Sequence, residues 1–198
     1  MAGQVPNVLI LGHSFVKRLQ RDMLSNFDAR VDANFKLQGS ALVHLHGIGG
    51  RTVAKLRSFD LQVVTSISPD VVILEIGTND LSLEPPEVVG SAIEELVRLL
   101  LDSFSVRVVG VCHVIPRGIS EMSHIPASLF AQRAQILNHY VSVVLDDIPN
   151  AFGWRQRNFS QTAKNVYLAY GVHLNLNPGQ YHLYRSYRGT ILKGLSCL

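Results

Sequence analysis

Cysteine is scarce in this sequence, which has only Cys112 and Cys197. Two cysteines this far apart exclude a disulfide framework and a thiolate metal site. Cys112 ends an apolar run, so we expect a buried thiol there, whereas Cys197 lies in the C-terminal tail. The low cysteine content favours a reducing, intracellular setting.

Long apolar runs and blocks of charge are also missing. No stretch approaches about 18 uninterrupted apolar residues, so we expect no transmembrane segment. The first residues, Met-Ala-Gly-Gln-Val-Pro, lack the positive and apolar regions of a signal peptide. The net charge of +3 permits an anionic partner but does not argue for one, because no Lys/Arg-rich run accompanies it.

The composition that remains is that of a globular protein. Of 198 residues, 47% are hydrophobic and 17% charged, which predicts a single domain over residues 1–198. Short apolar runs alternate with segments of helical spacing, which favours an α/β fold with a mostly parallel sheet and helices on both faces. The second strand falls within 33–38 or 41–45, and the pattern does not separate the two. We expect the other strands at 7–11, 71–76, 106–112 and 151–154. We expect helices from 15, over 52–65, 86–101, 127–145 and 178–195, and partly over 161–170.

The first apolar run ends in Gly-His-Ser, which places Ser14 at a strand-to-helix junction beside unpaired backbone N–H groups. Taken alone, this pattern is most typical of a serine that caps a helix. Two other segments, Gly49-Gly50 and Gly77–Asn79, follow the next strands. Because parallel strands end at one edge of a sheet, we expect all three segments to converge there.

Acyl transfer by serine needs a base, a group that orients the base, and donors for the oxyanion. Candidate donors are the N–H groups of Ser14 and Gly50 and the neutral side-chain amide of Asn79. Taken singly, Asn79 also fits a turn and Gly50 a flexible loop.

Eight histidines compete for the role of base, and spacing alone does not single out His173. His44 and His46 stand at strand spacing and could share a metal. No cysteine or carboxylate cluster accompanies them, so we expect no metal. The remaining candidates lie in or beside a polar loop or on expected helices: His113, His124, His139 and His182.

Four segments together resemble the SGNH (GDSL-like) hydrolases in order and spacing: Gly12-His13-Ser14-Phe15, Gly49-Gly50, Gly77-Thr78-Asn79-Asp80 and Gly171-Val172-His173-Leu174-Asn175. The resemblance implies a three-layer α/β/α fold similar to flavodoxin, with a five-stranded sheet. It implies Ser14 as nucleophile, His173 as base, and Ser14, Gly50 and Asn79 as oxyanion donors. The implied reaction is hydrolysis of a small-molecule ester or thioester through an acyl-enzyme, without metal or cofactor. Residues 183–189 are also similar to SGNH-type esterase domains of animal retrotransposons.

Two positions depart from the family pattern. His13 stands where the family usually has Asp, and Tyr170 replaces the Asp that orients the base. A neutral phenol stabilises imidazolium less than a carboxylate does, so we expect a slow Ser14–His173 dyad. A backbone carbonyl or Tyr170 would orient the imidazole, although Tyr170 fits a packed aromatic better. A protonated His13 could add positive charge beside the pocket, or the residue could disturb its loop.

Two other functions stay open. The altered motifs fit a binding module that kept the fold after losing efficient catalysis. The mild basicity fits a nucleic-acid-associated domain, but a solvated basic surface explains it better, because the sequence has no nucleic-acid recognition motif. The residues that would form the basic patch are Arg155, Arg157, Lys164, Arg185 and Arg188.

Overall fold

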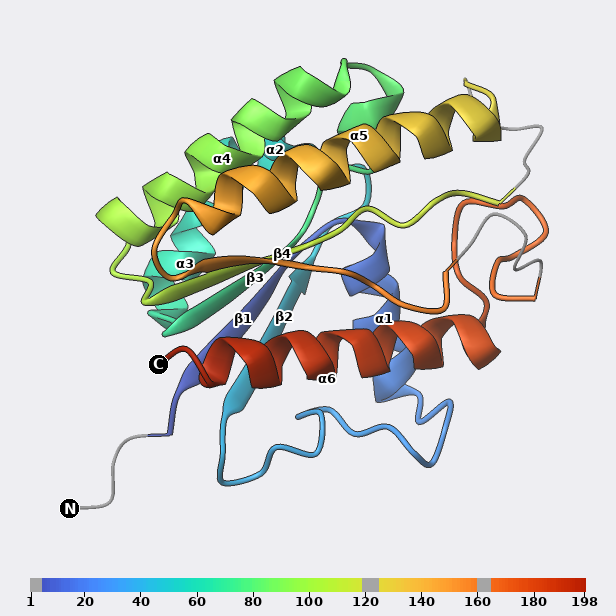
Figure 1. The fold of residues 1–198 in the computed structure, drawn as a ribbon. Coiled ribbons are helices and arrows are strands. Elements are labelled where there is room, and N and C mark those ends of the chain that lie inside the picture. The colour runs from blue at the N-terminus through green and yellow to red at the C-terminus, as the bar shows by residue number, and fades with distance from the viewer. Residues whose placement is uncertain (1–4, 119–124, 160–164) are drawn as a thin grey trace.

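The computed structural model describes residues 5–118, 125–159 and 165–198 of the chain. Five parallel strands form one sheet in the order β2-β1-β3-β4-β5 (Figure 1). This is the flavodoxin-like order, so the expected fold class is confirmed. The strands are β1 (Asn7–Gly12), β2 (Leu42–Gly47), β3 (Val71–Glu75), β4 (Val108–Cys112) and β5 (Ala151–Trp154).

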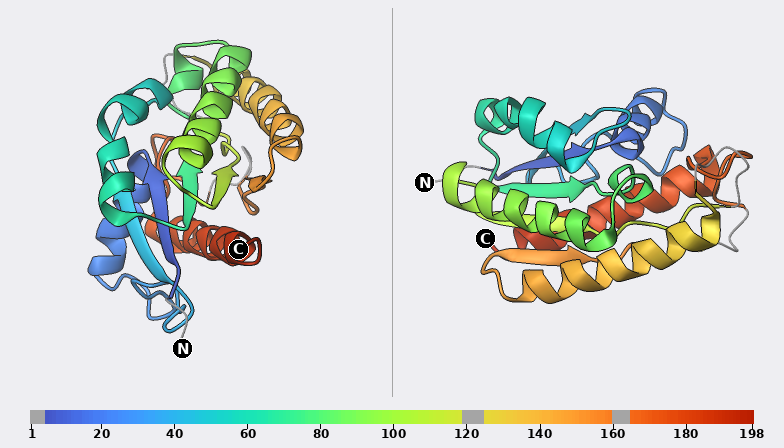
Figure 2. Two further views of the ribbon diagram at one scale, coloured as in Figure 1. Left: turned by 90° about the vertical axis from the view of Figure 1, so that its left-hand side faces the viewer. Right: turned by 90° about the horizontal axis from the view of Figure 1, so that it is seen from above.

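Helices cover both faces of the sheet. Figure 1 shows α1 and α6 below it and α4 and α5 above it, and the two turned views in Figure 2 show the same layers. The helices are α1 (Ser14–Leu24), α2 (Val53–Phe59), α3 (Leu61–Ile67), α4 (Pro86–Ser103), α5 (Ala127–Asp146) and α6 (Tyr181–Leu195). No helix in the described ranges is long and apolar enough to cross a membrane.

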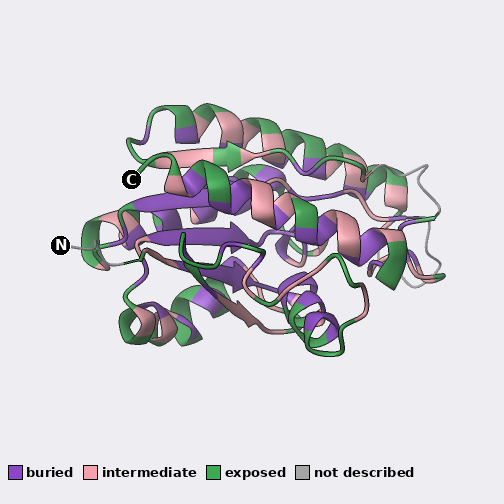
Figure 3. Cartoon of the chain, turned by 90° about the horizontal axis from the view of Figure 1, so that it is seen from below, coloured by how far each residue is buried: buried purple, intermediate pink, exposed green. Residues whose placement is uncertain are grey.

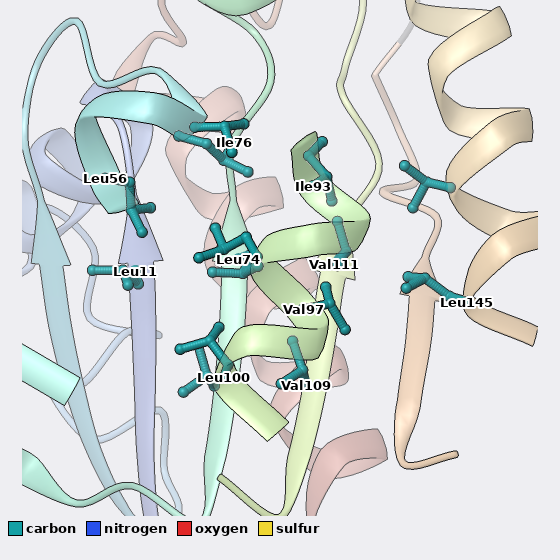
Figure 4. Packing of buried hydrophobic residues seen from close by; sticks show 14 of the residues in the cluster. Leu11, Leu56, Leu74, Ile76, Ile93, Val97, Leu100, Val109, Val111 and Leu145 are labelled. Atoms are coloured by element: carbon teal, nitrogen blue, oxygen red, sulfur yellow. The ribbon is translucent and has the colours of Figure 1, made fainter. Parts of the chain in front are cut away.

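Alternating side chains of the central strands build two apolar cores. Val8 and Ile10 of β1 pack with the residues of α1 and α6, whereas Leu9 and Leu11 pack with those of α2 to α5. Figure 4 shows the second core, in which Leu74 of β3 lies opposite α4. Burial on both faces requires apolar residues at successive positions, which is why β1 and β3 are continuous apolar runs. Figure 3 shows these central strands as buried along their length.

Of the two positions left open for the second strand, 41–45 is the right one: the strand is Leu42–Gly47, and 33–38 is a loop in which Phe35 and Lys36 adopt positive φ angles of 55°. Other expected elements differ in the structure. The helix expected over 52–65 is two helices that meet at Asp60. The Asp60 carboxylate accepts a hydrogen bond from Arg51. The last helix begins at Tyr181 instead of Pro178. Residues 165–170 are not helical, and 161–164 lie outside the described residues.

The sheet reverses its strand order at β1, which lies between β2 and β3. Ligands of such sheets bind at the carboxyl ends of the strands on either side of this reversal. The backbone here is close-packed: Ile48 N–H donates to Gly12 O at 3.0 Å, and His13 N–H donates to Glu75 O at 3.2 Å. A Cβ on Gly12 would lie 2.2 Å from Glu75 O, so only glycine fits. The segments after β1, β2 and β3 therefore meet at one edge, as expected.

Candidate active site

Ser14 is the first residue of α1, and its neighbour His13 is the residue that caps the helix. The His13 Nδ1 accepts a hydrogen bond from Phe15 N–H at 3.3 Å. The interpretation of Ser14 as the helix cap is therefore wrong. Its hydroxyl is left for another partner.

That partner is His173, whose Nε2 lies 3.0 Å from Ser14 Oγ although 159 positions separate the two residues. The loop that carries His173 is closed on itself. Leu168 N–H donates to His173 O at 2.8 Å, and Gly171 supplies a positive φ of 70° and donates to Leu168 O at 2.8 Å. A serine hydroxyl and an imidazole at this distance can exchange a proton.

Tyr170 stands behind the imidazole. Its hydroxyl lies 3.1 Å from His173 Nδ1 and accepts a hydrogen bond from Arg18 Nη2 at 3.2 Å. The phenol is thus more than a packed aromatic. Unlike a carboxylate, it can either accept a hydrogen bond from Nδ1–H or donate one to an unprotonated Nδ1, so it does not by itself fix the imidazole tautomer.

Burial and two guanidinium groups lower the pKa of His173. Burial is the largest cause, followed by the charges of Arg18 and Arg117, and the pKa falls to about 4. The imidazole is therefore neutral at pH 7, the state in which it can accept a proton from Ser14.

Gly50 and Asn79 lie in the loops after β2 and β3, on either side of the loop that carries Ser14. Gly50 adopts a positive φ of 72°. The Asn79 side-chain amide donates to Arg51 O at 2.7 Å. This bond ties the amide to the loop of Gly50 and leaves the second N–H of its NH₂ for another acceptor.

Two buried carboxylates hold this loop, and the sequence pattern gave no reason to single them out. Asp60 accepts from both Nε and Nη2 of Arg51 at 2.7 Å, and Asp80 accepts from Val53 N–H at 2.9 Å. Asp80 was visible only as part of the Gly-Thr-Asn-Asp motif. Asp60 stands within a run of continuous helical spacing, so the sequence carried no signal that could have revealed it.

His13 and Glu75 form a buried pair beneath the junction of β1 and α1. Both side chains are fully buried, with His13 Nε2 3.6 Å from Glu75 Oε1. Glu75 Oε2 accepts from Gln156 Nε2 at 2.8 Å. Burial lowers the pKa of His13 to about 3 and raises that of Glu75 to about 8. His13 is therefore neutral at pH 7, which argues against the alternative in which it adds positive charge beside the pocket.

The other histidines take no part in this arrangement. His46 Nε2 lies 3.4 Å from Asp60 Oδ1, and His113 Nε2 lies 3.0 Å from Ser142 Oγ. Within the described ranges, no three His, Cys, Asp or Glu residues gather closely enough to hold a metal ion. His44 is on β2, His139 on α5 and His182 on α6, while His124 and Lys164 lie outside the described residues.

Comparison with solved structures supports the same fold. A proposed acylhydrolase from Bacteroides fragilis is 20% identical, with a TM-score of 0.72 over 96% of this chain and 88% of the other. The psychrotrophic esterase EstA from Pseudoalteromonas, in a structure inhibited by monoethylphosphonate, is 18% identical. Its TM-score is 0.71, and the match covers 96% of this chain and 99% of the other. A carbohydrate acetylesterase family member from Sinorhizobium meliloti is 15% identical. Its TM-score is 0.71, and the match covers 97% of this chain and 100% of the other.

The sheet order, the serine that follows β1 and the histidine before α6 are those of an α/β protein of the SGNH type. Residues 10–177 match the model of the GDSL-like lipase/acylhydrolase family, and the chain belongs to this family. A search among curated proteins gave no significant match.

Proposed function

We propose that this chain is a serine esterase that hydrolyses small or short-chain acyl esters through an acyl-enzyme. The observation that carries the proposal is the 3.0 Å distance between His173 Nε2 and Ser14 Oγ. Family membership makes acyl hydrolysis the reaction class, and the acetylesterase in the structural comparison supports a short acyl group.

In the proposed reaction, Ser14 Oγ attacks the ester carbonyl while His173 Nε2 takes the hydroxyl proton. The negative charge moves to the carbonyl oxygen, where the N–H groups of Ser14 and Gly50 and the free N–H of Asn79 donate to it. The tetrahedral intermediate collapses, the C–O bond to the alcohol breaks, and His173 returns the proton to the alcohol oxygen. Water then attacks the acyl-enzyme by the same route and releases the acid.

Tyr170 takes the place of the orienting carboxylate in this scheme. With Nδ1–H donating to the phenol oxygen, Nε2 keeps the lone pair that the reaction requires. The phenol carries no charge to stabilise the imidazolium that forms, so the dyad works more slowly than a full triad. The similarity of residues 183–189 to retrotransposon esterase domains stays a prediction.

The test is labelling with a fluorophosphonate together with hydrolysis of p-nitrophenyl acetate. We expect labelling and turnover, with Ser14→Ala and His173→Gln each lowering kcat on the order of 10³-fold. The chain offers a matched control in Ser142, which also lies 3.0 Å from a histidine Nε2 but sits within α5 and donates to Asn138 O at 2.9 Å. Ser142→Ala should keep both signals. If wild type and Ser14→Ala behave alike, the proposal fails.

The replacement of the orienting carboxylate by Tyr170 also supports a second candidate, a binding module of the same fold with little catalysis. Saturable ester binding without turnover above Ser14→Ala would favour it. Association with nucleic acid stays a prediction, and RNA binding that weakens steeply with salt is its test.

A further inference from the structure

Two arginines flank the Ser14–His173 pair, and the proposed reaction of a neutral ester uses neither. Arg18 follows Ser14 by four residues on α1, so both lie on one face of the helix. Among the described residues, the side chain of Arg18 makes one hydrogen bond, to the Tyr170 hydroxyl. Arg117 lies in the segment after β4. Both guanidinium charges act on the His173 imidazole.

Arg117 is held in place from three directions. Its Nη2 donates to Thr78 O at 2.9 Å, next to Asn79, and its Cζ lies 4.2 Å from the centre of the buried Phe130 ring. The following residue, Gly118, donates from its N–H to Gly171 O at 2.7 Å. Arg117 is therefore fixed between the loop of Asn79 and the loop of His173.

No carboxylate in the described chain forms an ion pair with Arg117 or Arg18. Six other arginines pair with one: Arg21, Arg30, Arg51, Arg57, Arg98 and Arg107. Arg117 is only partly exposed, its Nε has no hydrogen-bond partner among the described residues, and burial lowers the pKa of its guanidinium. A half-buried cation without a counter-charge is costly, and an anionic ligand would remove that cost.

We propose that the ester hydrolysed at Ser14 carries an anionic group, a carboxylate or a phosphate, which Arg117 binds together with Arg18. Guanidinium groups suit both anions because they donate two parallel hydrogen bonds. The pinned Arg117 is ordered before the substrate arrives, so little side-chain entropy is lost on binding. This inference rests on the proposed esterase function and adds the substrate class to it.

The experiment compares three acetate esters of similar shape: 3-acetoxybenzoate, 3-acetoxyphenyl phosphate and the neutral 3-acetoxybenzamide. We expect kcat/KM for at least one anionic ester to exceed that for the amide by about 10-fold or more. The better anion identifies the carboxylate or the phosphate as the preferred group. The preference should shrink in 0.5 M salt, because added ions screen the attraction.

Arg117→Gln should reduce the ratio of anionic to neutral kcat/KM to near one, and Arg18→Gln should reduce it in part. The matched control is Arg98→Gln, which removes a surface arginine paired with Glu94 on α4 and should keep the ratio. Equal rates for all three wild-type substrates would overturn the proposal. The proposal would also be overturned if Arg117→Gln kept the wild-type ratio of anionic to neutral kcat/KM. An equal loss of kcat/KM for charged and neutral esters in that variant would overturn it too.

Calorimetric titration of the Ser14→Ala protein with 3-acetoxybenzoate, 3-acetoxyphenyl phosphate and the amide tests the anion site without turnover. Tighter binding of an anion, lost in the Ser14→Ala, Arg117→Gln double variant, supports the site even if the esterase proposal fails. Equal binding of the amide and both anions contradicts the site even if p-nitrophenyl acetate is hydrolysed.

Discussion

The imidazole of His173 contacts a phenol where hydrolases of this family place a carboxylate. Tyr170 joins His173 to Arg18 through its hydroxyl, so a cation stands behind the dyad instead of an anion. Positive charge at this place disfavours imidazolium and keeps the base unprotonated. In the proposed reaction, this charge keeps His173 ready to act as general base before attack, and it stabilises little of the imidazolium that would form during attack.

Removing the Tyr170 hydroxyl tests its part in positioning the base. We expect Tyr170→Phe to lower kcat about 10-fold with little change in KM, because the hydrogen bond that aligns His173 is lost while the ring remains. Steady-state hydrolysis of p-nitrophenyl acetate measures this. Tyr140→Phe, which removes a hydroxyl bonded to Glu94 on the surface of α4 and α5, is the control. An unchanged kcat in Tyr170→Phe would show that the Tyr170 hydroxyl does not orient His173 and that the backbone does.

The lowered pKa of His173 predicts the pH profile. The free base is the active form, so kcat/KM should rise as pH increases through the pKa, about 4, and stay level toward neutral pH. Arg18→Gln removes a positive charge that lowers this pKa, so the midpoint should move upward. Arg98→Gln should leave it in place. A wild-type midpoint near 6.5, the ordinary histidine value, would contradict the prediction.

At the scale of elements, the loop of residues 48–53 positions two of the proposed oxyanion donors. Asp60, at the junction of α2 and α3, binds Arg51 with both oxygens, and the carbonyl of Arg51 receives the amide of Asn79. The side chain of Asp60 is 3% exposed, so this ion pair is shielded from solvent. The break between the two helices thus holds the carboxylate that anchors the loop.

A double-mutant cycle tests this chain of contacts. Asp60→Asn should lower kcat about 10-fold, because Arg51 loses its bidentate partner and its carbonyl no longer fixes Asn79. In an Asn79→Ala background, Asp60→Asn should lower kcat by a much smaller factor, because the amide that Asp60 positions is already absent. Glu95→Gln, which breaks the exposed pair with Arg57, is the control. Equal losses in both backgrounds would show that Asp60 does not act through Asn79.

The elements differ in how well the sequence predicted them. The strands β1 and β3 were predicted closely because both of their faces are buried and their apolar runs are unbroken. The edge strand β2 was ambiguous because one side of it is unpaired and its residues are only partly buried. The split of α2 from α3 was missed because the apolar spacing continues through Asp60. The two helices meet at the ion pair between Asp60 and Arg51, and an ion pair leaves no periodic pattern in the sequence.

At the scale of the whole molecule, the parallel topology brings remote residues to one edge of the sheet. Ser14 and His173 were predicted as partners from a family resemblance, because spacing alone does not place a loop 159 residues away. Arg117 was missed for the same physical reason. Its place depends on Thr78, Phe130 and the loop of His173, which only the folded sheet brings together.

The buried pair of His13 and Glu75 couples the stability of the whole fold to pH. Folding raises the pKa of Glu75 from about 4.5 to about 8, so the folded protein holds a proton that the unfolded chain has released. The stabilisation from this group is complete below pH 4.5 and is lost as pH rises toward 8. His13, with a pKa lowered from 6.5 to about 3, acts oppositely and destabilises the fold as pH falls below 6.5.

Glu75→Gln should separate these two effects, because the amide keeps the size and a hydrogen-bond donor but does not titrate. We expect the melting temperature of the wild type to fall between pH 6.5 and pH 8.5 by about 5 °C more than that of Glu75→Gln. Thermal unfolding followed by circular dichroism at half-unit pH steps measures the difference. Glu95→Gln, an exposed glutamate, should track the wild type. Parallel curves for wild type and Glu75→Gln would mean that Glu75 does not keep its proton in the fold, so that its carboxylate is charged at neutral pH.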